Sequence, residues 1–146
     1  MNEGVILLVE DNSDDEALAR RGIEKAGLAR PLVVVRDGEE ALNYLLGTGR
    51  YEGRDVEDLP RVVLIDLQLP KIGGLEVLRA MRSDKRIRHV PVVILTSSRL
   101  RRDIADAYAL GANSYVCKPL EYDELMSTIQ QVAAYWGSIN EHCIED

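Results

Sequence analysis

The sequence alternates between short runs of apolar residues and longer segments in which apolar residues recur every three or four positions. The runs cover residues 5–9, 31–35, 62–65, 92–95 and 114–116, and most of them are built from valine, isoleucine and leucine. Uninterrupted runs rich in β-branched residues are typical of strands that are buried on both faces. The pattern therefore predicts five short strands at the centre of the fold.

Helical patterns lie between and after these runs. The first helix is expected to begin at a capping box formed by Ser13 and Glu16, a pairing that satisfies backbone N–H groups at a helix start. Apolar stripes at helical spacing are formed by Ala19, Ile23 and Ala26 in the first helix and by Leu125, Ile129, Val132 and Trp136 in the last. We expect further helices over residues 39–46, 75–82 and 100–110.

Strand and helix alternate five times along 146 residues, a length typical of one domain. The alternation predicts an α/β fold of the (βα)5 type, in which a doubly wound, five-stranded parallel sheet is covered by helices on both faces. The connection over residues 47–60 contains three glycines and several charges. We expect it to be an exposed loop rather than a linker between domains.

Composition and charge argue against several classes of function. The chain has 18 basic and 25 acidic residues, and its net charge of −7 makes nucleic acid and anionic membranes poor partners. No apolar run approaches the roughly 18 residues that span a bilayer, and the start lacks the pattern of a signal peptide, so we expect a soluble, cytoplasmic protein. The isolated positions of Cys117, Cys143, His89 and His142 argue against disulfides and zinc chemistry.

Polar residues follow four of the five predicted strands. Glu10 and Asp11 follow the first strand, Asp66 the third and Thr96 the fourth, and Lys118 comes within two residues of the fifth. The carboxyl ends of parallel strands meet at one edge of the sheet, where such folds bind their ligands. We therefore expect three carboxylates, a hydroxyl and an ammonium group to converge there.

This convergence predicts a particular chemistry. Carboxylates at separations of roughly 4 to 6 Å repel each other by about a few kcal/mol per pair, so positive charge must compensate. Lys118 supplies one charge, and a ligand set made only of oxygen also suits a hard divalent cation such as Mg²⁺, which often shares its coordination with a phosphoryl group. A carboxylate can itself attack phosphorus, and Asp66, after the central strand, is best placed to do so.

Each of these residues also has an ordinary structural explanation. Asp11, together with Asn12, could cap the first helix. Asp66 could be a turn residue that is hydrogen-bonded to its own backbone. Thr96 could simply end a strand, and Lys118 could be a solvated loop lysine. Their joint position at adjacent strand ends favours the functional interpretation.

Four segments resemble, in order and spacing, the motifs of response-regulator receiver domains of two-component signalling. They are ILLVEDNSDDE, VVLIDLQLPKIGG, VVILTSS and SYVCKPL, and the resemblance covers about residues 4–135. It implies a CheY-like receiver domain of flavodoxin-like fold over residues 1–136, followed by a tail over 137–146. The segment AYALGANSYVCKP and the aromatic pair Tyr135-Trp136 further resemble the sequences of the single-domain regulators that partner bacterial and cyanobacterial phytochromes.

The resemblance implies a role for each matching residue of the predicted site. Asp66 would be the phosphoacceptor. Mg²⁺ would be held by Asp11, Asp66 and the backbone carbonyl of Gln68, and Glu10 would assist through water or indirect contacts. Lys118 would pair with the phosphoryl oxygens and neutralise the charge that develops during transfer.

The same resemblance implies a conformational switch. Thr96 would hydrogen-bond the phosphoryl group and draw the following loop inward, while Tyr115 would change its rotamer in concert. Ser97 would leave room for the phosphoryl donor. The bond between Lys118 and Pro119 would be cis. The movement would pass to the face formed by the fourth helix, the fifth strand and the fifth helix.

The implied function is that of a single-domain response regulator. The protein would accept a phosphoryl group from a sensor histidine kinase, with a phytochrome as a candidate, and would signal through protein contacts. Beyond its own phosphotransfer and dephosphorylation it would not act as an enzyme. The alternative is an aspartate-nucleophile phosphatase of the haloacid dehalogenase type, which requires a second acid two residues after the nucleophile, where Gln68 stands.

A basic cluster is the first candidate for a partner contact. Arg99, Arg101 and Arg102 crowd the start of the fourth predicted helix. The helix dipole disfavours cations there by about 0.3 to 1 kcal/mol each. The arginines form either a docking patch for an acidic partner or a solvated basic turn.

The tail is the second candidate. Tyr135, Trp136 and Ile139 continue an apolar stripe beyond the last predicted helix. Exposed apolar patches commonly mark interfaces, and the resemblance to phytochrome-associated regulators implies a homodimer. The alternative is a tail that folds back on its own core.

Overall fold

The structure, a computed structural model, describes residues 4–143 and contains one sheet of five parallel strands. The strands are β1 (Ile6–Val9), β2 (Leu32–Val35), β3 (Val62–Ile65), β4 (Val92–Thr96) and β5 (Ser114–Cys117). Their order across the sheet is β2-β1-β3-β4-β5. β1, β3 and β4 are therefore interior strands, flanked on both sides.

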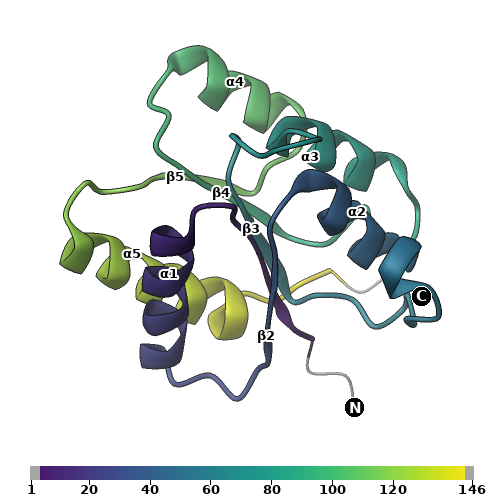
Figure 1. Ribbon diagram of the computed structural model, residues 1–146, viewed down its shortest axis with the longest axis horizontal. Coiled ribbons are helices and arrows are strands. Elements are labelled where there is room, and N and C mark those ends of the chain that lie inside the picture. Colours follow the sequence, from purple (N-terminus) through teal and green to yellow (C-terminus); the bar gives the residue numbers. More distant parts are fainter. Residues whose placement is uncertain (1–3, 144–146) are drawn as a thin grey trace.

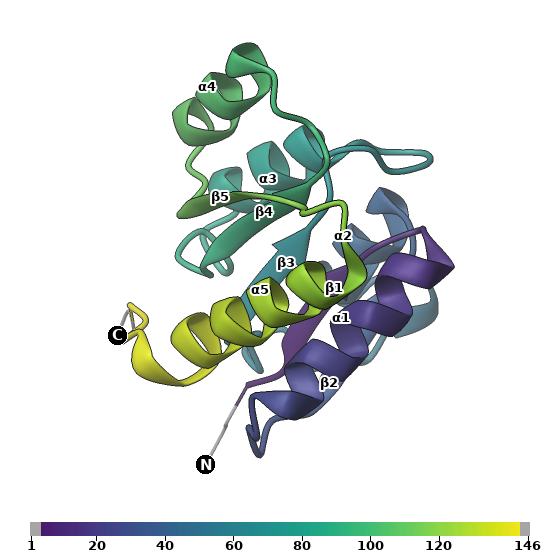
Figure 2. The ribbon, with the colours of Figure 1, turned by 90° about the vertical axis from the view of Figure 1, so that its left-hand side faces the viewer.

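Helices cover both faces of this sheet. They are α1 (Ser13–Lys25), α2 (Gly38–Leu46), α3 (Gly74–Ser83), α4 (Arg101–Ala109) and α5 (Tyr122–Ala134), with a short 3₁₀ helix η1 (Gly49–Tyr51) and a π-helical turn η2 (Tyr135–Ile139). Helices α1 and α5 lie together on one face, and α2, α3 and α4 lie on the other (Figures 1 and 2). In the described part of the chain, no helix has the length and hydropathy needed to cross a membrane.

The predicted (βα)5 architecture is confirmed, and each strand differs from its predicted limits by at most one residue. The predicted cap of the first helix is wrong by one position. Asn12 is the N-cap, and its side-chain oxygen accepts a hydrogen bond from the Asp15 backbone N–H at 2.9 Å. Ser13 instead lies inside the helix, because the Glu16 N–H that a capping Ser13 would bind already donates to the Asn12 backbone carbonyl at 2.9 Å.

Each face of the sheet buries its own core. Leu7 and Val63 point into the core beneath α2, α3 and α4, while Ile6 and Leu64 point into the core beneath α1 and α5. Every residue of β1, β3 and β4 is buried. Burial on both faces explains why these strands are uninterrupted apolar runs in the sequence.

Strand register aligns the ends of the strands at one edge of the sheet. Val9 of β1 is paired with Ile65 of β3, and Thr96 of β4 is paired with Cys117 of β5. The residues that follow these strands therefore leave the sheet next to one another, at the edge where the sequence places its polar residues.

Candidate functional site

Four polar side chains predicted from the sequence to converge lie together at the carboxyl edge of the sheet. Glu10 follows β1, Asp66 follows β3, Thr96 ends β4 and Lys118 follows β5. All four are buried, with exposed fractions from 0% for Thr96 to 8% for Asp66. Because buried charges are costly unless they are paired, the contacts among these residues decide what the site can do.

The Lys118 ammonium group lies at the centre of the cluster. Its Nζ donates to Glu10 Oε2, Asp15 Oδ2 and Asp66 Oδ2, each at 2.7 Å. An ammonium group has three N–H donors, so the three carboxylates use all of them. Short, charge-assisted contacts of this kind are among the stronger hydrogen bonds in proteins. Lys118 therefore joins the ends of β1 and β3 to the first turn of α1.

Both carboxylate oxygens of Asp66 are engaged. Oδ2 accepts from Lys118, whereas Oδ1 accepts from the Thr96 hydroxyl at 2.8 Å and from the Gln68 backbone N–H at 3.1 Å. The carboxylate thus has a cation on one oxygen and two neutral donors on the other. This arrangement fixes its orientation.

Burial and pairing act in opposite directions on the charges of this cluster. Burial lowers the pKa of the Lys118 ammonium, but hydrogen bonds to its three carboxylate partners outweigh burial and hold that pKa above its ordinary value. For Glu10, burial dominates and raises the pKa of the carboxyl, although Lys118 and the Asn12 N–H, 3.1 Å from Oε1, oppose the shift. Lys118 therefore stays charged at neutral pH.

Three other predicted site residues are exposed beside this cluster, and one residue that contacts Lys118 was not predicted from the sequence. Asp11, Gln68 and Ser97 are exposed in the loops after β1, β3 and β4. Asp15, which the sequence did not single out, contacts Lys118 from the first turn of α1. A helix that starts at this edge must bring its first-turn acids near the site, but only the fold shows which of them reaches the lysine.

The loop between β4 and α4 is held in place by Ser98. Its backbone carbonyl accepts from the Tyr115 hydroxyl at 2.9 Å and contacts the Cys117 thiol at 3.6 Å. Its own hydroxyl donates to Asp103 Oδ2, in the first turn of α4, at 2.5 Å. A change of the Tyr115 rotamer, which the resemblance to receiver domains implies, would have to break the contact with Ser98.

The predicted cis bond between Lys118 and Pro119 is wrong, because every peptide bond of the described residues is trans. The Lys118 backbone N–H donates to the Thr96 carbonyl at 2.8 Å, which continues the pairing of β5 with β4 up to the proline. Trans is also the intrinsically favoured isomer of an X–Pro bond, by about 0.5–1 kcal/mol. The lysine side chain reaches the cluster with the trans bond in place.

The residues predicted to bind Mg²⁺ supply oxygen ligands of the right chemical kind. Carboxylate and carbonyl oxygens are what this cation takes from proteins, and Glu10, Asp11, Asp66 and the Gln68 carbonyl provide them. Within residues 4–143, however, the His, Cys, Asp and Glu side chains do not form a ready metal-binding group of three. Lys118 lies between Glu10 and Asp66 and contacts both.

A sequence profile of the response regulator receiver domain family matches residues 6–130, which is most of the chain. The chain belongs to this family. Over 135 residues it is 42% identical to the probable methanogenesis regulatory protein FilR2 of Methanothrix harundinacea, covering 90% of this chain and 83% of that protein. Over 132 residues it is 33% identical to the response regulator Rcp1 of Synechocystis sp., covering 90% and 88%.

Solved structures of response regulators share the fold of this receiver domain. The phosphorylated cyanobacterial phytochrome response regulator RcpA matches with a TM-score of 0.88 at 34% identity, covering 95% of this chain and 97% of that one. The Mn²⁺-bound form of Rcp1 matches with a TM-score of 0.89 at 31% identity, covering 97% and 99%. The predicted family and the resemblance to phytochrome response regulators are therefore confirmed.

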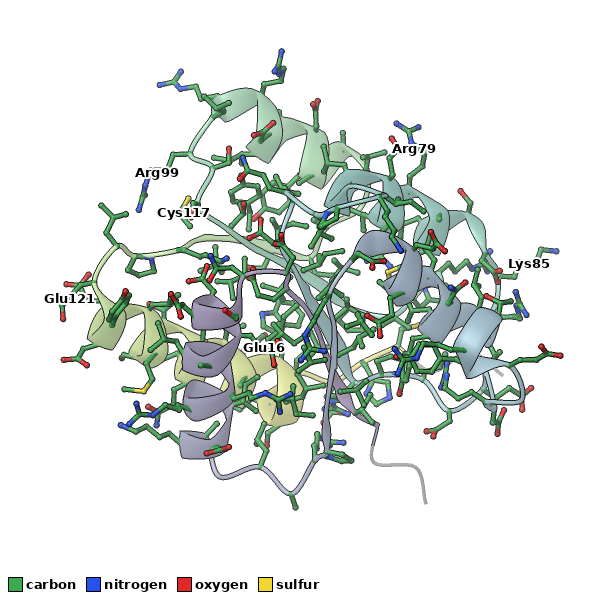
Figure 3. The ribbon with its side chains drawn as sticks, viewed as in Figure 1. Glu16, Arg79, Lys85, Arg99, Cys117 and Glu121 are labelled. Carbon is green, nitrogen blue, oxygen red and sulfur yellow. The ribbon has the colours of Figure 1, made fainter. Side chains whose placement is uncertain are left out.

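The three arginines of the predicted docking patch are exposed around the start of α4. Arg99 precedes the helix, and Arg101 and Arg102 lie in its first turn. Figure 3 shows the Arg99 side chain extending away from the body of the receiver domain. Both interpretations of this cluster require exposure, so the docking patch stays a prediction.

The tail of the receiver domain folds back over the amino edge of the sheet. Arg30 Nε donates to the Gly137 carbonyl at 2.5 Å. The Arg61 guanidinium donates to the Asn140 carbonyl and lies 2.5 Å from Nδ1 of His142. The predicted tail segment is thus packed on its own domain as far as His142, and residues 144–146 lie outside the described part of the chain.

The apolar residues predicted as a dimer contact divide into two kinds. Trp136 is half-buried against the core beneath α1 and α5. Tyr135 and Ile139 are 46% and 67% exposed. Trp136 therefore fits the alternative of a tail folded on its own core, and the predicted homodimer contact now depends on Tyr135 and Ile139.

We expect the docking of the tail to weaken as the pH falls below about 6.5. Burial, Arg61 and Arg30 lower the pKa of His142, so the folded state binds this proton less readily than an unfolded chain does. The stability contributed by neutral His142 is then present above the ordinary pKa and is lost as the pH falls toward the folded-state pKa. Emission of Trp136, the one tryptophan of the chain, should shift to the red in this window.

The matched variant for this titration is His142→Gln, which keeps a polar side chain but cannot titrate. It should abolish the pH-dependent shift of Trp136 emission. A shift of equal size in the variant would show that another group controls the tail.

Proposed function

We propose that this response regulator accepts a phosphoryl group on Asp66 from a phosphohistidine of a sensor histidine kinase. The observation that carries the proposal is the pair of contacts to Asp66, with Lys118 at 2.7 Å from one oxygen and the Thr96 hydroxyl at 2.8 Å from the other. Donors aimed at the place where charge develops stabilise a transferring group. Membership of the receiver domain family supports the same role.

The proposed transfer is a displacement at phosphorus. One carboxylate oxygen of Asp66 forms the new O–P bond, and the P–N bond of the donor breaks with its electron pair left on the imidazole nitrogen, which takes up a proton. Lys118 pairs with the phosphoryl oxygens, and the Thr96 hydroxyl turns from Asp66 Oδ1 to a phosphoryl oxygen. Attack of water on phosphorus later releases phosphate and restores the carboxylate.

A divalent cation belongs to the proposed site. Glu10, Asp11, Asp66 and the backbone carbonyl of Gln68 would hold it. When bound, it would offset the charge of these carboxylates and of the entering phosphoryl group. The Mn²⁺-bound form of Rcp1 supports a divalent metal, and we propose Mg²⁺.

The proposed readout of phosphorylation passes through the loop after β4. A phosphoryl group adds up to about two negative charges and three acceptor oxygens. Thr96 ends β4, and Ser98, two residues later, is bonded to Tyr115 of β5 and Asp103 of α4. A displacement of Thr96 toward the phosphoryl group therefore pulls on both elements.

We propose two partners for this protein, a sensor kinase and a second copy of the chain. A phytochrome-type sensor kinase is supported by the similarity to RcpA, a phytochrome response regulator. A second copy of the chain is the partner proposed for Tyr135 and Ile139. Phosphatase activity of the haloacid dehalogenase type is not favoured, because Gln68 stands where the second acid is required and turns its backbone N–H toward Asp66.

The test of this function is a phosphorylation assay read by intact mass. We expect acetyl phosphate to add one phosphoryl group to the protein in the presence of Mg²⁺, and none after the metal is chelated. Asp66→Asn should remain unmodified, whereas Asp14→Asn, which changes an exposed acid, should be modified as the parent protein is. Modification of Asp66→Asn, or an unmodified parent protein, would refute the proposal.

A further inference from the structure

Lys118 has a carboxylate partner that the proposed transfer does not use. Asp15 Oδ2 lies 2.7 Å from its Nζ, as close as the oxygens of Glu10 and Asp66. The surroundings of these acids differ, because the Asp15 side chain is 27% exposed, against 3% for Glu10 and 11% for Asp66.

We infer that Asp15 is a positioning residue that binds the Lys118 ammonium in the unphosphorylated protein and competes with the phosphoryl group for this ammonium. The inference rests on the proposed function, since it concerns Lys118 during transfer to Asp66. All three N–H donors of the ammonium are taken. A phosphoryl oxygen therefore gains a donor only when one carboxylate gives one up.

Asp15 is the carboxylate that gives way. Glu10 and Asp66 are buried, so water does not readily replace the ammonium beside them, and each would lose a short, charge-assisted hydrogen bond without a substitute if Lys118 left it, whether or not the cation is bound. The Asp15 side chain is partly exposed, so a water molecule can replace the ammonium as its hydrogen-bond partner at a small cost in free energy. The strength of this one contact then sets how readily Lys118 turns to the phosphoryl group.

The experiment compares Asp15→Asn with Asp14→Asn. Both variants remove one negative charge from the first turn of α1, but Asp14 is exposed and only Asp15 contacts Lys118. With Mg²⁺ and acetyl phosphate, Asp15→Asn should be phosphorylated about three- to tenfold faster than Asp14→Asn. It should also bind beryllium fluoride, a phosphoryl mimic, more tightly by a similar factor, an equilibrium effect that a purely structural role would not produce.

Equal rates and affinities in the two variants would overturn the inference, and so would slower transfer in Asp15→Asn, which would make Asp15 an anchor that Lys118 needs. These outcomes presuppose a parent protein that is phosphorylated on Asp66. Failure of the parent protein itself would instead refute the proposed function. Thermal unfolding reports whether Asp15→Asn is folded, and Asp15→Ser, suited to a helix start, repeats the comparison if it is not.

Discussion

Replacement of Lys118 by methionine is expected to lower the free energy of unfolding by about 3–5 kcal/mol, because it removes the cation from a cluster of buried acids. Glu10 and Asp66 are 3% and 8% exposed, and each lies 2.7 Å from the ammonium nitrogen. Methionine keeps most of the apolar stem, so the loss reports the charge rather than a cavity. Urea unfolding measures it.

The decrease in the free energy of unfolding caused by Lys118→Met should depend on pH. Burial raises the pKa of Glu10 even with the lysine present, and removal of the ammonium raises this pKa further. An acid whose folded-state pKa exceeds its unfolded value binds more protons in the folded state, so it stabilises at low pH and this contribution is lost as the pH rises through the folded-state pKa. The variant should therefore recover stability near about pH 5 relative to about pH 8.

The matched control is Lys71→Met. Lys71 pairs with Asp37 at 3.8 Å, with side chains that are 60% and 21% exposed. Loss of such a surface pair costs less than about 1 kcal/mol. Equal losses in the two variants, or a loss in Lys118→Met that does not change with pH, would show that the buried acids do not need this cation.

Gly74→Ala is expected to destabilise the protein by about 1–3 kcal/mol and to slow phosphorylation by up to about a hundredfold. A Cβ at Gly74 would lie 2.3 Å from the Asp66 carbonyl oxygen and 2.8 Å from Leu67 Cα. Both are backbone atoms, which cannot rotate away. Either α3 or the peptide that carries the acceptor must move, so stability and transfer rate should fall together.

The neighbouring glycine provides the control. A Cβ at Gly73 would meet only the Leu67 carbonyl oxygen, at an ordinary contact distance of 3.7 Å. Gly73→Ala should therefore lose less than about 1 kcal/mol, the range of a changed helix cap, and keep its rate of phosphorylation. Similar behaviour of the two variants in chemical unfolding and in the mass assay would mean that close packing of α3 on Asp66 is not what positions the acceptor.

Much of the site could be predicted because strand ends are local features of a sequence. Asp66, Thr96 and Lys118 each follow or end an apolar run, and parallel strands of similar length bring such residues to one edge. The helix cap was placed one residue late because Asn12 and Ser13 are both good capping residues. Choosing between them requires the backbone conformation of the chain as it leaves β1.

The contact of Asp15 with Lys118 could not be predicted in this way. These residues are 103 positions apart, and three acids occupy the first turn of α1. Which acid faces the lysine depends on the rotation of α1 about its axis. That rotation follows from the packing of Ala19, Gly22 and Ile23 against the sheet and α5, not from the residues of the first turn.

The order of strands and helices and the chemical character of the carboxyl edge were thus already present in the amino-acid pattern, because alternation and burial act over a few residues at a time. The tail seated on Arg30 and Arg61 and the third partner of Lys118 were decided by the folded chain alone. Each depends on distances between segments far apart in sequence, and such distances exist only after the helices have packed on the sheet.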